Sequence, residues 1–171
     1  MNIKSVHGQN ICVPIFYIKI NIERINIMEK TPELLCYIYK NVKMGSDAII
    51  TLLPKIEDEA FRKALTAQLD GYEKFAKEAE NQLTPMGIKP KEEPMMKKMG
   101  AKVGIMMNTM TDTTSSHMAE MMIKGSTMGI TDMTKKVGEF EGDGCPDKAL
   151  SLGRELIRFE QDNIEKMKEY L

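Results

Sequence analysis

Residues 58–83 read DEAFRKALTAQLDGYEKFAKEAENQL and predict one long amphipathic helix. Positions three or four apart carry residues suited to a core, in the order Phe61, Leu65, Gln68, Tyr72, Phe75, Ala79 and Leu83. This spacing places the whole set on one face of an α-helix. Asp58 is a favourable N-cap and Pro85 follows the last apolar position, so we expect the helix to begin near Asp58 and to stop before Pro85.

The same three- or four-residue spacing of apolar residues predicts four further helices. The first begins at Thr31, a capping residue followed by Pro32 at the position that suits proline, and it ends at Pro54. Its apolar face comprises Leu35, Ile38, Val42, Gly45, Ile49 and Leu52. The other helices are expected at about 95–110, 116–140 and 146–170, and no strand pattern follows Met28.

These elements predict an all-α fold in which four long helices form an antiparallel bundle. The connection between the first two helices is short, which makes them antiparallel neighbours. The short helix at 95–110 then serves as a crossover between two helical hairpins, which is the ferritin-like topology. We therefore expect one helical-bundle domain over residues 28–171.

Residues 1–27 differ from the rest of the chain and are expected to be a spurious or disordered extension. They hold eight isoleucines and four asparagines, residues typical of AT-rich DNA translated in frame. Glu23-Arg24 would be encoded by purine-rich codons placed where a bacterial ribosome-binding site precedes Met28. The hypothesis is that translation starts at Met28, and sequencing the N-terminus of the native protein tests it.

Composition gives no positive sign of nucleic acid, of a membrane or of secretion. Lys and Arg total 24, Asp and Glu total 25, and the net charge is −1, so no basic surface is expected. The three cysteines are far apart and include no C-x-x-C pair, which favours free thiols in a cytoplasm. No dyad or triad for acid–base or nucleophilic catalysis is legible, so an enzyme is the less favoured prediction.

The chain resembles the ferritin-like superfamily that includes rubrerythrins. The resemblance rests on the order and lengths of the helices: the helix at 58–82, the short crossover helix and the closing helix at 150–170. The chain is most similar to a bacterial branch of small ferritin-like domains of unknown function, some linked to stress responses. Metal-binding members of the superfamily place a Glu from one helix of each hairpin and a Glu-x-x-His from its partner at the bundle centre.

The resemblance implies the fold, but the expected ligands are mostly replaced in this chain. The helix centres carry Gly45, Gln68 followed by Gly71, Gly125-Ser126, and Glu160 followed by Asn163. Only Glu160 is then a plausible ligand. Gln68 and Asn163 are expected to face inward as a buried polar pair that bonds to each other or to water, and a divergent metal or ligand pocket is the alternative.

Two other features could bind metal. His117 and Glu120 lie three residues apart on one helical face and could form half a site, although a solvated pair in the first helical turn is the favoured interpretation. Eleven methionines lie from Met95 to Met133. They predict core filling first, a partner-binding surface second, and a copper or silver site third.

The sequence thus favours a non-catalytic, methionine-rich ferritin-like bundle without a cofactor, acting by association with a protein partner or with further copies through its helical faces, or as a stress-related accessory module. The alternative is a metal-binding bundle, using iron or manganese through carboxylates or copper through methionines.

Overall fold

The computed structural model describes residues 15–90, 111–142 and 145–171, and it describes side chains from residue 30 onward. All regular structure in these residues is helical, as predicted. Its elements are α1 (Ile15–Leu52), η1 (Leu53–Lys55), α2 (Glu59–Leu83), η2 (Thr84–Met86), α4 (Ser115–Gly142) and α5 (Asp147–Lys168). The helix predicted at 95–110 lies outside the described residues.

Helix α2 confirms the prediction made from residues 58–83. Asp58 is its N-cap, and Oδ1 of Asp58 accepts hydrogen bonds from the backbone N–H groups of Ala60 at 2.8 Å and Phe61 at 3.1 Å. Six of the seven positions on the predicted apolar face are buried, while Phe75 is half-buried. The helix ends in η2, and Gly87 follows with a φ of 70° in the left-handed region, which glycine adopts at low cost.

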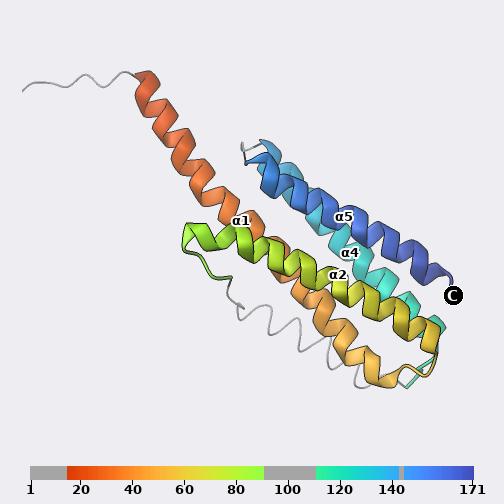
Figure 1. Ribbon diagram of the computed structural model, residues 1–171. Helices are drawn as coiled ribbons and strands as arrows, with labels where there is room; N and C mark the ends of the chain where they lie inside the picture. The colour runs from red at the N-terminus through yellow and green to blue at the C-terminus, as the bar shows by residue number, and fades with distance from the viewer. Residues whose placement is uncertain (1–14, 91–110, 143–144) are drawn as a thin grey trace, which may run out of the picture.

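The start predicted for the first helix is wrong. Helix α1 begins at Ile15 and runs through Pro32, so Thr31 is an interior helical residue and not a cap. Proline inside a helix removes one hydrogen bond and crowds the preceding turn, which makes it a boundary signal without forbidding the helix. Figure 1 shows the part of α1 before the bundle, in red and orange, extending past the ends of the other helices. Whether residues 1–27 are translated stays a prediction.

The later helices agree with their predicted bounds to within two residues. Helix α4 was expected at 116–140 and spans Ser115–Gly142, and α5 was expected at 146–170 and spans Asp147–Lys168. Pro146 precedes α5 as its N-cap, and Lys166 and Lys168 stand in its last turn, where cations favour the helix dipole.

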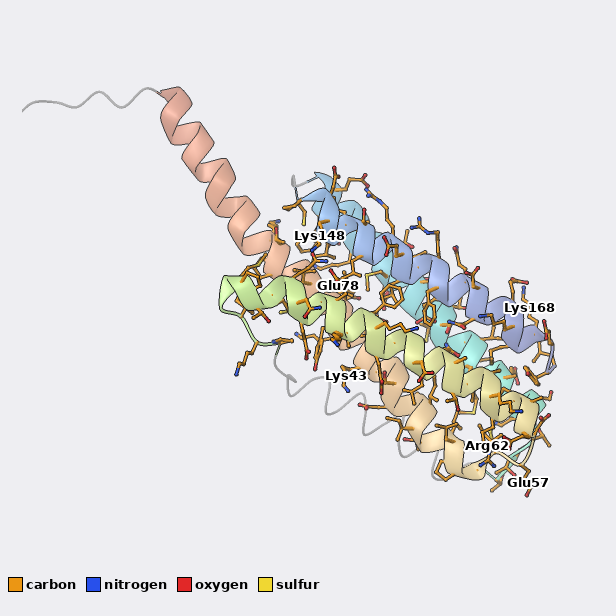
Figure 2. All side chains as sticks on the ribbon, in the orientation of Figure 1. Lys43, Glu57, Arg62, Glu78, Lys148 and Lys168 are labelled. Carbon is orange, nitrogen blue, oxygen red and sulfur yellow. The ribbon has the colours of Figure 1, made fainter. Side chains whose placement is uncertain are left out.

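The four helices pack as two pairs that share one core. Helix α1 packs chiefly on α2, and α4 chiefly on α5, while α1 also contacts α4 and α5 and α2 contacts α5 (Figure 1). Leu35, Ile38, Val42, Ile49 and Leu52 of α1 are fully buried, as their spacing predicted. Lys148 of α5 and Glu78 of α2 meet at the exposed edge of the bundle with Nζ and Oε1 3.6 Å apart (Figure 2). Such exposed pairs contribute little to stability.

No helix in the described part of the chain combines the length and apolar character needed to cross a lipid bilayer.

Candidate functional site at the bundle centre

One carboxyl group is buried at the centre of the bundle. Glu160 of α5 is 5% exposed. Its Oε1 accepts a hydrogen bond from the hydroxyl of Tyr72 on α2, and its Oε2 accepts one from the hydroxyl of Ser126 on α4, each at 2.6 Å. Hydrogen bonds to an ionised carboxylate are shorter and stronger than neutral ones. A single side chain therefore ties three helices together.

The hydrogen-bonded chain extends one residue further, to Gln68. Nε2 of Gln68 donates to the hydroxyl oxygen of Tyr72 at 3.1 Å, one helical turn away on α2. Gln68 is only 1% exposed, so water does not reach its Oε1, and this oxygen has no hydrogen-bond partner in the described part of the protein. A buried polar atom without a partner costs free energy, so such atoms call for an explanation.

Aromatic rings fill the space around these hydrogen-bonded side chains. A Cβ atom on Gly45 of α1 would lie 2.6 Å from Cζ of Tyr72, and a Cβ atom on Gly71 of α2 would overlap the ring of Phe159. The rings of Tyr72 and Phe159 meet edge to face at 5.5 Å between centroids. The two glycines thus admit rings into the bundle centre that any other residue would exclude.

Burial controls the charge states of the central groups. Loss of solvation raises the pKa of Glu160, while the hydrogen bonds from Ser126 and Tyr72 lower it by less than burial raises it. Burial and the neighbouring Glu160 raise the pKa of Tyr72 well above its usual value, so the phenol stays neutral and donates. Glu160 can therefore bind and release one proton, while the hydroxyl groups of Tyr72 and Ser126 beside it stay neutral.

The raised pKa of Glu160 makes a prediction about stability and pH. A carboxyl group with a higher pKa in the folded state binds more protons there than in the unfolded chain, so stability falls as pH rises. The loss begins near the ordinary Glu pKa of 4.5 and is complete above the folded pKa. Glu160→Gln removes this term. We expect the unfolding free energy of the wild type, minus that of Glu160→Gln, to decrease from pH 4 to pH 8 in urea titrations, and a rising difference would contradict the assignment.

Gln68 and Asn163 are both buried, at 1% and 2% exposed, but they do not hydrogen-bond to each other. Nδ2 of Asn163 donates to the backbone carbonyl of Phe159, one turn earlier on α5, at 2.8 Å. The expected mutual hydrogen bond is replaced by two separate ones because each amide finds a partner within its own helix. Glu160, one turn from Asn163, makes the contact between α2 and α5 instead.

A double-mutant cycle tests this assignment. Asn163→Leu is expected to destabilise, because it removes a hydrogen bond worth about 0.5–1.5 kcal/mol. Gln68→Leu should cost less, because it removes the hydrogen bond to Tyr72 and also the unpartnered Oε1. The double variant should lose the sum to within about 0.5 kcal/mol, since the residues share no hydrogen bond. The measurement is the urea midpoint of all four proteins. Recovery of stability in the double variant would show that the two amides act as a pair.

His117 and Glu120 lie away from the central carboxyl group. Glu120 is exposed, and its Oε1 pairs with Nζ of Lys124 at 2.6 Å, which lowers the pKa of Glu120. His117 lies nine residues before Ser126, or about 13 Å along α4. Among the residues described, no three of His, Cys, Asp or Glu stand close enough to hold a metal ion together.

The described methionines divide between core and surface. Met118, Met122, Met133 and Met167 are buried and fill the core, while Met128 is 65% exposed. The methionines from Met95 to Met110 lie outside the described residues. Flexible thioether side chains fill irregular gaps between helices, which accounts for the buried set.

Sequence reasoning identified Gln68, Glu160 and Asn163 but missed the roles of Tyr72 and Ser126. The ring of Tyr72 suits the apolar face of α2, and its hydroxyl makes the contact with Glu160. The available signal was the four-residue spacing from Gln68 to Tyr72, since a buried phenol needs a hydrogen-bond partner.

Comparison of the chain with protein-family models, with curated proteins and with solved structures finds no match.

Proposed function

We propose that this protein is a ferritin-like, antiparallel four-helix bundle whose function lies in protein association at its outer helical faces and not in chemistry at its centre. The observation that carries the proposal is the filled centre. The rings of Tyr72 and Phe159 occupy the space beside Gly45 and Gly71, and both oxygens of Glu160 already accept hydrogen bonds. A carboxylate held in this way is an acceptor within a packed core, and metal coordination would require its hydroxyl partners to leave.

Contacts between the helices support the antiparallel arrangement. Between α2 and α5, Phe61 lies against Tyr170, Tyr72 bonds to Glu160, and Glu78 pairs with Lys148, so residue numbers rise on one helix as they fall on the other. Between α1 and α4, Glu33 pairs with Lys136 at 3.2 Å, and Gly129 lies beside Asn41.

The same contacts support a ferritin-like topology. Because α1 and α2 are joined by a short connection, they run in opposite directions. Helix α4 also runs opposite to α1, so α2 and α4 run in the same direction. Parallel second and third helices are also the arrangement found in ferritin-like folds, which supports the proposed topology.

The proposal also indicates which surface would bind a partner and in which compartment the protein acts. With the centre closed, the surface available for recognition is the outside of the helices, where a second copy or another protein could pack. A role as a stress-related accessory protein in a bacterial cytoplasm is proposed from the resemblance in helix order and length. Iron or manganese held by Glu160 and neighbouring oxygen atoms is the competing function, because the unpartnered Oε1 of Gln68 is an oxygen donor in the same place.

Elemental analysis separates these two functions. The full chain would be incubated with excess Fe²⁺ or Mn²⁺ without oxygen, desalted and measured for metal, with Glu160→Gln as the matched control. We expect less than about a tenth of an equivalent in both proteins. Near-stoichiometric metal in the wild type that disappears in Glu160→Gln would replace the association proposal with the metal-binding one.

Sedimentation analysis tests association directly. The chain 1–171 and the chain starting at Met28 would be compared over a concentration series, because both contain the complete bundle. We expect reversible, concentration-dependent association in both. Association of the long chain alone would assign the contact to residues 1–27, and strictly monomeric behaviour of both would rule out self-association.

A further inference from the structure

The bundle centre combines an acid with a buried acceptor that has no hydrogen-bond donor. The acid is Glu160 of α5, and the acceptor is Oε1 of Gln68 on α2. The hydroxyl of Tyr72 lies between them, 2.6 Å from Oε1 of Glu160 and 3.1 Å from Nε2 of Gln68. All three side chains are at most 5% exposed.

The direction of these hydrogen bonds depends on the charge of Glu160. An ionised carboxylate only accepts, so the single hydrogen of the Tyr72 hydroxyl must point towards Glu160. The oxygen of Tyr72 is then left to accept, and Gln68 meets it with its NH₂ group. This orientation leaves the carbonyl oxygen of Gln68 without a donor.

A proton on Glu160 reverses this order. The protonated Oε1 becomes a donor to the oxygen of Tyr72, and Tyr72 turns its own hydrogen towards Gln68. Rotation of the Gln68 amide by half a turn then places its oxygen where its nitrogen was, so this oxygen accepts from the Tyr72 hydroxyl. The NH₂ group moves to the position where the oxygen had no donor. One proton is bound at Glu160, and no other group gains or loses one.

We propose that Gln68, Tyr72 and Glu160 form a proton-linked switch in the bundle centre, in which protonation of Glu160 reverses the hydrogen bonds and turns the amide of Gln68. Burial favours uptake of this proton, because it raises the pKa of Glu160. The switch is independent of the proposed association, since it requires only the contacts within one chain.

The surroundings of Glu160 isolate this titration from other charges. Helix α2 contacts it through the titratable hydroxyl of Tyr72, and helix α4 contacts it through the neutral hydroxyl of Ser126. Helix α1 brings Gly45 against the Tyr72 ring and the buried Ser46, whose hydroxyl donates to the Val42 carbonyl at 2.9 Å. Among the described residues, the shift in the Glu160 pKa comes from burial and these two hydroxyl groups, without a charged neighbour.

The experiment is an NMR titration of the full, uniformly ¹³C- and ¹⁵N-labelled chain from pH 4 to pH 9. The carboxyl carbon of Glu160 and the side-chain carbonyl carbon and amide nitrogen of Gln68 would be followed. We expect all three signals to move with one shared midpoint above the ordinary Glu value of 4.5. Signals of Gln68 that stay constant while Glu160 titrates would overturn the proposal, as would the absence of any Glu160 midpoint in this range.

Two variants separate the switch from a general effect of pH. Tyr72→Phe keeps the ring beside Gly45 but removes the hydroxyl, so Glu160 should still titrate while the Gln68 signals become constant. Ser126→Ala removes the other donor to the carboxylate, so the midpoint should rise while Gln68 still follows Glu160. Continued titration of Gln68 in Tyr72→Phe would refute the link. If that variant does not fold, the wild-type and Ser126→Ala titrations still decide the question.

Discussion

Phe61→Ala is expected to lower the free energy of unfolding by about 3–5 kcal/mol, the range observed when a fully buried aromatic ring is removed. Phe61 is 0% exposed at the start of α2, and its ring lies 4.8 Å from the ring of Tyr170, between centroids. The loss of stability has two parts: the favourable free energy of burying the ring is lost, and a cavity is left between α2 and the end of α5. Urea unfolding followed by far-ultraviolet circular dichroism measures it.

Phe75→Ala is the matched control for that prediction. Phe75 lies on the same face of the same helix and makes a ring contact with Phe159 at 5.3 Å, but it is only half-buried. It therefore loses less contact and leaves part of its space to solvent, and we expect a clearly smaller loss of stability. An equal or larger loss at Phe75 would mean that the packing assigned to α2 is incorrect.

Gly71→Ala is expected to destabilise the bundle although alanine is the better helix former. The added Cβ atom would overlap the ring of Phe159, which in turn supports Tyr72 and Phe75. Overpacking of a filled core costs about 1–3 kcal/mol. That exceeds the gain of roughly 0.5–1 kcal/mol that alanine brings to a helix interior.

Gly125→Ala provides the control, because a Cβ atom at Gly125 of α4 meets nothing within 4 Å. Only the helix-forming gain remains there, so we expect stability to rise by roughly 0.5–1 kcal/mol. Opposite signs for the two variants in thermal or urea unfolding are the expected result. Gain of stability at Gly71 would show that the ring of Phe159 moves aside freely and that the centre is not closely packed.

Local sequence predicted the positions of the helices more accurately than it predicted how deeply individual residues are buried between them. The cap at Asp58, the break at Pro85 and the apolar face of α2 depend on residues within a few turns of one another, so the pattern alone specifies them. The start of α1 was missed because Thr31 and Pro32 are a local boundary signal that the surrounding helix overrides. Phe75 was assigned to the core face but lies at its edge, since the width of a buried face depends on the neighbouring helices.

The candidate site could be predicted only in part, because its contacts also depend on neighbouring helices. Spacing placed Gln68 and Asn163 on inward faces, while Glu160 was a candidate only through the resemblance to ferritin-like proteins, and all three are buried. Spacing could not tell which side chains meet. The contact between Tyr72 and Glu160 joins residues 88 positions apart, and that between Ser126 and Glu160 joins residues 34 apart.

The pattern of residues was enough to predict that this chain forms amphipathic helices and which of their faces turn inward, because helical periodicity is a local property of the backbone. The hydrogen bonds of the inward polar groups depend instead on how the helices pack together. Contacts between α2, α4 and α5 bring the hydroxyls of Tyr72 and Ser126 to Glu160, and the glycines at positions 45 and 71 make room for the rings beside it. Partners of this kind depend on the register between helices, which no single stretch of sequence encodes.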